Sequence, residues 1–461
     1  MIGKERLFGT DGVRGLANRD PMSPEMAFRL GRSGAEQLKG DRAARGMIVV
    51  GRDTRLSCDM LEAALSAGIC AAGVDVVQTG VLPTPAIAYL TRAWGALGGV
   101  MLSASHNPFE DNGIKFFAAD GFKLPDAQED LLEEMVYSRT ARQAPTGRDI
   151  GRIHVAADAA EQYMAFALST LGEGLSLAGL RIVLDCANGA ASPVAPPLFE
   201  RLGAQVIACS TQADGTNINQ QCGALFPEQA QALVRRAGAH VGFCFDGDAD
   251  RMIAVDETGV IRDGDDVLGI CTHALLARGG LRTRRVVGTV MSNYGLEEAL
   301  QRMEVELIRA PVCDKYVLAE MQRSGAILGG EPSGHIIFLT HATTGDGIIT
   351  ALQLLHVMQA LGQPLSRLCA VLTKYPQVLL NVRIRERKDP LGLSDVQKVL
   401  SQARQTLNGT GRILVRLSGT EPLARVMVEG RNLETVQAVA HTIAHAIDRA
   451  IGATVALPAA C

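Results

Sequence analysis

The chain has 461 residues, which is too long for one hydrophobic core and predicts about three or four domains. Hydrophobic residues make up 47% of the chain and charged residues 20%, with a formal net charge of -4, as is typical of a soluble globular protein. This mild charge gives no electrostatic support for a nucleic-acid partner, and without a secretory signal or an apolar run of about 18 residues we expect a cytoplasmic protein that does not cross a membrane.

The first part of the chain alternates strand-like and helix-like patterns. Short apolar runs predict strands, and apolar residues at helical spacing predict one helix capped by Ser57 and another with Thr84 as cap and Pro85 as first residue. This β-α-β-α-β order predicts a largely parallel, helix-covered sheet. The expected elements are a strand at 47–50, a helix at 57–72, a strand at 74–78, a helix from 84 toward 94, and a strand at 100–102.

The same order recurs twice, with strands at 181–185 and 205–209 around a helix at 194–202, and strands at 286–290 and 305–309 around a helix at 296–303. We therefore predict three similar α/β domains with mixed, largely parallel sheets. Strands at 378–385, 412–417 and 425–429 with helices at 394–407 and 434–451 predict a smaller C-terminal α+β domain. The predicted domains cover residues 1–152, 153–257, 258–368 and 369–461. The ten cysteines form no CxxC pair, so we expect reduced thiols, with Cys461 exposed.

A polar loop follows the apolar strand at 100–102. It carries Ser105 and His106 in the segment SASHNP, and Lys115 follows behind a turn predicted at Asn112 and Gly113. A hydroxyl nucleophile needs a partner that takes its proton, and a leaving oxygen needs an acid. These residue types could supply both parts, although an ordinary polar surface loop would have the same composition.

Three aspartates alternate after the apolar segment 241–245. Asp246, Asp248 and Asp250 project to one side of an extended chain, and converging carboxylates are ligands that Mg²⁺ prefers. A solvated acidic turn is the alternative, whereas the terminal glutamate of a calcium loop is absent. Near the N-terminus, the glycines of FGTDGVRG allow a tight turn that brings Arg14 toward an anion.

Two later turns have compositions that suit a phosphorylated sugar. GEPSGH presents Glu331, Ser333 and His335, and a carboxylate beside a hydroxyl pairs well with sugar hydroxyls or an amine. RLSGTEPLAR lies between two predicted strands; it could form a nest for a dianionic phosphate, or a simple hairpin. TTGDG, at 343–347, is expected to start a helix. The candidate phosphate-binding residues are Arg416, Ser418, Gly419, Thr420 and Arg425.

These motifs resemble those of the α-D-phosphohexomutase family, in the family's order and over almost the whole chain, and SASHNP is similar to the loop of its glucosamine-phosphate mutases. The resemblance implies four domains around a central cleft, a phosphoryl group on Ser105, and Mg²⁺ held by the three aspartates and an oxygen on Ser105. It also implies Lys115 as the general acid or base, His106 as the residue that orients the loop, and Arg251 as a brace for the phosphoryl group or an aspartate. His335 could be a second acid or base.

The implied reaction interconverts glucosamine 6-phosphate and glucosamine 1-phosphate through a hexose bisphosphate, which is both intermediate and activator. The alternatives are a phosphomannomutase/phosphoglucomutase, a catalytically silent sugar-phosphate sensor, and a Mg²⁺ phosphatase with Asp246 as nucleophile. Pro332, Cys313 and Lys315 depart from the Gln, Gly and Arg that are more usual in the family, although Lys315 could still serve as a phosphate charge. We expect a monomer or a homodimer.

Overall fold

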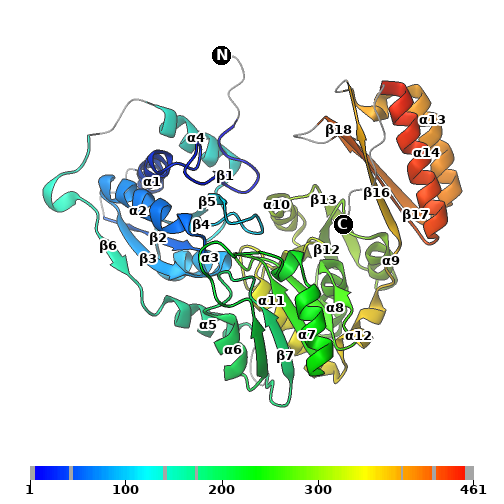
Figure 1. The fold of residues 1–461 in the computed structure, drawn as a ribbon, viewed down its shortest axis with the longest axis horizontal. Coiled ribbons are helices and arrows are strands. Elements are labelled where there is room, and N and C mark those ends of the chain that lie inside the picture. The colour runs from blue at the N-terminus through cyan, green and yellow to red at the C-terminus, as the bar shows by residue number, and fades with distance from the viewer. Residues whose placement is uncertain are drawn as a thin grey trace. The chain divides into compact units, whose positions relative to one another are not determined.

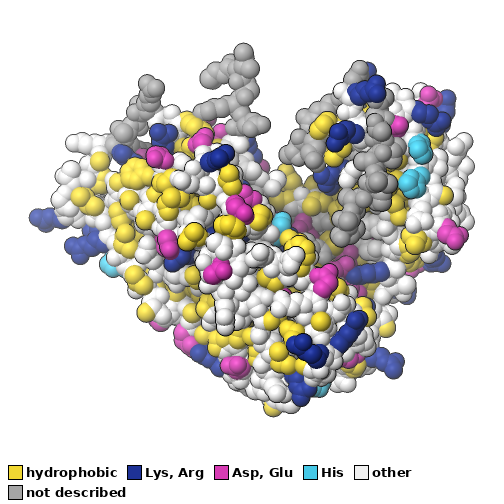
Figure 2. Space-filling view, viewed as in Figure 1, with side chains coloured by type: hydrophobic (Ala, Val, Ile, Leu, Met, Phe, Trp, Pro, Cys, Tyr) yellow, Lys and Arg dark blue, Asp and Glu magenta, His cyan; other side chains and the backbone are white. Residues whose placement is uncertain are grey.

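The computed structural model describes residues 6–40, 45–138, 143–171, 175–385, 388–417 and 422–451. The chain divides into two compact units, Met1–Thr289 with Ala310–Ala370 and Val290–Arg309 with Val371–Cys461 (Figure 1). Within the described ranges, none of the helices combines the length and the apolar character that a membrane span requires. On the face drawn in Figure 2, acidic and basic side chains are interspersed with hydrophobic and neutral ones.

The first sheet carries the Ser105 loop, which joins two neighbouring strands, β4 and β5. β4 pairs parallel with β2 and antiparallel with β5, so the sheet is mixed but largely parallel. The strand order is β1 (Val13–Leu16), β5 (Asp111–Ala118), β4 (Gly98–Leu102), β2 (Met47–Arg52), β3 (Asp75–Val81) and β6 (Ile153–Val155), and the helices are α1 (Pro24–Lys39), α2 (Ser57–Ala71), α3 (Thr84–Ala93) and α4 (Asp126–Tyr137).

Glycines bring α1 and α2 into backbone contact beside this sheet. A Cβ atom at Gly31 would lie 2.2 Å from the carbonyl oxygen of Leu65, and one at Gly68 would lie 2.1 Å from that of Phe28. Any larger side chain would push the two helices apart, and the core beneath them would lose its close packing.

The second sheet carries the three aspartates on the turn between β9 and β10. These two strands are antiparallel, whereas β9, β7 and β8 are parallel neighbours. The strand order is β11 (Ile261–Arg262), β10 (Met252–Asp256), β9 (Val241–Phe245), β7 (Arg181–Asp185) and β8 (Gln205–Cys209), and the helices are α5 (Ala159–Ser169), α6 (Ala195–Arg201) and α7 (Glu228–Ala237).

The third strand-helix-strand segment consists of β12, α9 and β13, as the sequence predicts. β14 pairs parallel with β12 and antiparallel with β15, and GEPSGH runs from the last residue of β14 through the turn between these two strands. The elements are α8 (Gly264–Ala277), β12 (Arg285–Thr289), α9 (Tyr294–Arg302), β13 (Glu306–Ala310), α10 (Asp314–Ser324), β14 (Leu328–Gly330), β15 (Ile336–Phe338), α11 (Gly347–Leu361) and α12 (Leu365–Leu368).

The C-terminal domain is the predicted smaller α+β domain. Its sheet, in the order β16 (Gln377–Arg383), β18 (Leu423–Gly430) and β17 (Gly411–Leu417), is antiparallel throughout. Figure 1 shows α13 (Ser394–Leu407) and α14 (Leu433–Ile451) together on one face of this sheet. The apolar stripe of α14, which includes Val436, Ile443 and Ile447, is buried in the core that they share.

The predicted elements are confirmed to within three residues at each end, but three local details are wrong. Ser57 and Thr84 are the first residues of α2 and α3 and cap neither helix. The Ser57 hydroxyl instead accepts a hydrogen bond from Asn112, and the Thr84 hydroxyl donates to Asp248. Asn112 and Gly113 form no turn, because both lie in β5. The prediction for Cys461 lies outside the described residues.

Candidate active site

Ser105 lies at the centre of the site, in a backbone conformation that few residues other than glycine adopt. Its φ is +53°, and its backbone N–H donates to the Ser103 hydroxyl at 2.8 Å. The side chain is buried, and its Oγ donates to Oδ2 of Asp246 at 2.7 Å and lies 3.3 Å from Nδ1 of His106. The loop therefore directs the hydroxyl of one domain at the aspartate turn of the next.

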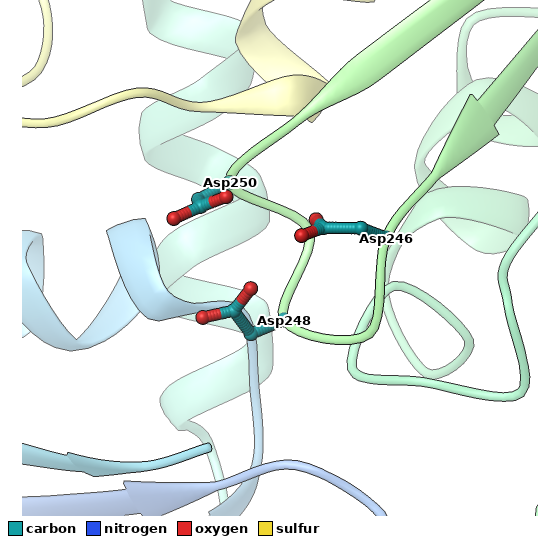
Figure 3. A group of neighbouring side chains, drawn as sticks. All are labelled: Asp246, Asp248 and Asp250. Carbon is teal, nitrogen blue, oxygen red and sulfur yellow. The ribbon is translucent and has the colours of Figure 1, made fainter. Parts of the chain in front are cut away.

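The carboxylates of Asp246, Asp248 and Asp250 face a common space, with oxygens within 4.8 Å of one another (Figure 3). All three are buried, and burial together with the charges of Asp250 and Asp248 raises the pKa of Asp246 to about 8. Oδ1 of Asp248 has no hydrogen-bond partner among the described residues, and Oδ1 of Asp250 has His335 Nδ1 at a long 3.5 Å. Buried oxygens left without partners are costly, so the cluster fits a divalent cation with oxygen ligands.

Lys115 reaches the same cluster from β5. Its side chain is 1% exposed, and its Nζ lies 2.8 Å from Oδ2 of Asp248 and 3.0 Å from Oδ2 of Asp11. Burial alone would lower the pKa of this amine, but Asp11 and Asp248 raise it above its ordinary value. The Thr84 hydroxyl donates to the same Asp248 oxygen at 2.5 Å. Lys115 is therefore held as a cation beside the serine and the aspartates.

Two arginines bring positive charge to the mouth of this site. Arg14 pairs with Asp11, and Arg251 donates its backbone N–H to Oδ1 of Asp246 at 3.2 Å. Both arginines line a cavity of about 220 Å³. His106 lines the same cavity, and burial together with the charges of Arg251 and Arg14 lowers its pKa to about 4. The cavity therefore presents two arginines and a neutral imidazole alongside four acidic side chains, those of Asp11, Asp250, Asp314 and Glu331.

The GEPSGH turn, between β14 and β15, forms another part of the cavity wall. Glu331 lines it and accepts a hydrogen bond from the Ser333 hydroxyl at 3.2 Å. The carbonyl of Pro332 accepts from the N–H of Gly264 at the start of α8, so the turn is fixed to that helix. Nε2 of His335 accepts from the Gly345 N–H at 3.1 Å, which leaves Nδ1 toward Oδ1 of Asp250 at 3.5 Å. The polar side chains of this turn, which could hydrogen-bond to a sugar, therefore lie next to the aspartates.

Comparisons with known proteins identify the family to which this chain belongs. Models of the four domains of phosphoglucomutase/phosphomannomutase match residues 5–143, 161–259, 263–375 and 379–446. The phosphoglucosamine mutase of Desulforudis audaxviator is 56% identical over 92% of this chain and 94% of its own. That of Moorella thermoacetica is 53% identical over 94% and 97%. The chain belongs to the phosphoglucomutase/phosphomannomutase family, in its phosphoglucosamine mutase branch.

Solved structures support the same family assignment. A phosphoglucomutase/phosphomannomutase family protein from Burkholderia thailandensis is 25% identical, with a TM-score of 0.80 over 98% of this chain and 99% of its own. The N-acetylphosphoglucosamine mutase of Aspergillus fumigatus, solved in complex with GlcNAc-6P and magnesium, is 17% identical over 98% and 97%, with a TM-score of 0.68. That second likeness shows the shared phosphohexomutase fold.

Lys315, which the sequence suggested as a phosphate contact, pairs with acidic side chains of α4. Nζ of Lys315 lies 2.8 Å from Oε2 of Glu129 and also pairs with Asp126, so acids of α4 neutralise it. A lysine that sequence reasoning missed lies closer to the site, because half-buried Lys123 pairs with both Asp11 and Asp314. Asp11 belongs to the FGTDGVRG motif, but that motif gave no signal of its ion pairs with the two lysines.

The predicted phosphate loop is only partly described. Arg416 on β17 lies directly opposite Arg425 on β18, and burial together with the charge of Arg425 lowers the pKa of Arg416. Two cations facing each other across a strand pair favour an anion between or above them. Ser418, Gly419 and Thr420 lie outside the described residues, so their part in the site stays a prediction.

Proposed function

We propose that the chain interconverts glucosamine 6-phosphate and glucosamine 1-phosphate, with Ser105 as the phosphoryl carrier. The observation that supports this most directly is the short contact from Ser105 Oγ to Asp246, beside Lys115 and the aspartate cluster. Phosphorylated Ser105 would give its phosphoryl group to the free hydroxyl of the sugar phosphate. The resulting hexose bisphosphate would turn around and return its other phosphoryl group to the Ser105 oxygen.

Mg²⁺ is the proposed metal, with Asp246, Asp248, Asp250 and an oxygen on Ser105 as its ligands. The converging, partly unpartnered carboxylate oxygens fit such an ion. When bound, it would neutralise negative charge on the transferring group. Lys115, held as a cation against Asp248, would supply or hold the proton at the reacting oxygen, while His106 orients the loop.

The substrate would be held at both of its ends. Glu331 and Ser333 would read the amino sugar, His335 would act as a second acid or base, and Arg14 and Arg251 would attract the reacting phosphate. The non-reacting phosphate would bind the C-terminal domain through Arg416 and Arg425, with Ser418, Gly419 and Thr420 forming the nest. The proposed domains are those predicted from the sequence, at 1–152, 153–257, 258–368 and 369–461.

The deciding experiment is one assay of the purified protein with Mg²⁺ and added hexose bisphosphate. Glucosamine 6-phosphate is compared with mannose 6-phosphate and glucose 6-phosphate, and turnover is measured for each. We expect the highest kcat/KM on the amino sugar. A preference for the neutral hexose phosphates would assign the chain to phosphomannomutase/phosphoglucomutase activity, and no turnover of any of them would overturn the proposal.

Lys115→Met tests the proton-transfer role. General acid or base groups contribute about 10² to 10⁴-fold, so kcat should fall by about that factor while KM changes little. Lys123→Met is the matched control, because Lys123 is a half-buried cation that also pairs with Asp11 but makes no ion pair with Asp248 among the described residues. A change confined to KM would make Lys115 a ground-state phosphate contact.

Arg425→Ala tests whether Arg425 binds the non-reacting phosphate of the substrate. Removing a charge-assisted contact of about 1.5 to 3 kcal/mol should weaken substrate and intermediate binding by roughly ten to a hundredfold. The escaping intermediate would leave Ser105 dephosphorylated, so we expect a raised KM and progressive inactivation that added hexose bisphosphate reverses. Arg404→Ala, an exposed arginine on α13 of the same domain, should behave as the wild type. Normal KM and sustained activity in Arg425→Ala would show that Arg425 does not bind the non-reacting phosphate.

A further inference from the structure

Arg55 holds the backbone of the Ser105 loop from inside the first domain. It lies at the turn before α2 and is only 1% exposed, although arginine is rarely buried to this extent. Its Nη2 donates to the carbonyl oxygens of Ser105 and Asn107, each at 2.9 Å. Its Nη1 donates to those of Pro108 and Asp111, the latter at 3.0 Å. One guanidinium group thus fixes four carbonyls, three in the Ser105 loop and one on the first residue of β5.

Asn219 holds the same loop from the second domain. Its Nδ2 donates to the carbonyl oxygens of Ser105 at 2.9 Å and Asn107 at 3.1 Å, so each of these carbonyls accepts from both domains. Asn219 is buried, and its own backbone N–H donates to the carbonyl of Ala187 at 2.9 Å. A Cβ atom at Gly247 would lie 2.5 Å from the Ser105 carbonyl, so the aspartate turn approaches the loop closely at this point.

The backbone conformation of Ser105 is strained and must be stabilised by its surroundings. Ser105 adopts a φ of +53°, which is unfavourable for a residue with a Cβ atom and persists only where the surroundings impose it. Asp53 fixes Arg55 by accepting from its Nε at 2.9 Å, and it also accepts from the Ser103 hydroxyl at 2.7 Å. With the carbonyls fixed in this way, the Ser105 side chain points at Asp246.

We propose that Arg55 and Asn219 form a carbonyl clamp that positions Ser105 for phosphoryl transfer. Neither residue touches the reacting atoms, so both are positioning residues, and the inference rests on the proposed function. Arg55 sets the shape of the loop, whereas Asn219 sets its distance from the domain that carries the aspartates. A displacement of about 1 Å at a reacting atom can cost about 10²-fold in rate, which makes such a clamp important for turnover.

Asn219→Asp is the sharpest test of the clamp. The side chain keeps its size, but a carboxylate oxygen replaces the N–H donor and faces two carbonyl oxygens. We expect kcat to fall by about 10²-fold, and KM to stay within about threefold, because the sugar and phosphate contacts are untouched. Asn219→Ala removes the donor without adding repulsion and should give a smaller fall in kcat. The matched control is Gln220→Glu, which makes the same amide-to-acid change on an exposed neighbour.

Two further measurements separate positioning from general destabilisation. The rate at which hexose bisphosphate phosphorylates Ser105, followed by intact mass in a single turnover, should fall with kcat, while the melting temperature of Asn219→Ala stays near that of the control. The inference is overturned if both Asn219 variants keep a kcat within twofold of Gln220→Glu, or if their loss appears in KM alone. An inactive wild-type protein would instead refute the proposed function.

Discussion

Ser105→Ala should abolish mutase turnover, by several orders of magnitude, and leave the fold intact. The substitution removes the only atom that would carry the phosphoryl group in the proposed reaction, and the remaining residues offer no second hydroxyl against Asp246 in the described site. The structural cost is that of one buried hydrogen bond, about 1 to 3 kcal/mol, which a domain of this size tolerates. Steady-state turnover and the melting temperature measure the two effects separately.

Intact mass gives this prediction an independent readout. The wild-type protein should show a partial phosphoryl adduct that Ser105→Ala lacks, whereas Ser401→Ala, at an exposed position of α13, should keep both the adduct and the activity. Near-normal turnover in Ser105→Ala would show that the covalent mechanism is wrong. Acid-stable label on a carboxylate instead of serine would favour the phosphatase with Asp246 as its nucleophile.

Asp248→Asn should weaken Mg²⁺ binding and lower turnover by several orders of magnitude. One carboxylate oxygen of Asp248 is left unpartnered toward the cluster, and the other accepts from Lys115 at 2.8 Å and from Thr84 at 2.5 Å. The amide removes an anionic ligand and also weakens the ion pair that holds Lys115. The substitution therefore acts on the metal and on the proton donor together, which is why its effect should exceed that of Lys115→Met.

Titration calorimetry with Mg²⁺ and turnover at increasing Mg²⁺ measure this effect. Excess Mg²⁺ should recover part of the metal-dependent loss in Asp248→Asn, but not the part that comes from Lys115. Asp59→Asn, on the exposed side of α2, is the control and should bind Mg²⁺ as the wild type does. Undiminished wild-type activity in a chelator would remove the metal from the mechanism.

The sequence by itself determined the elements and the chemistry on each turn. Apolar segments that alternate with turn residues predicted the three strand-helix-strand units and the strands and helices of the C-terminal α+β domain, because these patterns act over a few residues at a time. For the same reason the loop of Ser105 and the aspartates at 246, 248 and 250 were recognisable, since each motif is contiguous in the chain.

Only the tertiary structure decided which distant side chains complete the site. No local sequence pattern indicates that Thr84 contacts Asp248, that Asp11 contacts Lys115, or that Asn219 contacts Ser105. The sequence also suggested Lys315 as a phosphate contact, whereas the structure pairs it with acidic residues of α4. Short-range patterns specify secondary structure, but a contact between residues more than a hundred positions apart depends on how separate domains pack. Sequence periodicity does not specify that packing, so the side chains that contact the motif residues could be identified only in the folded structure.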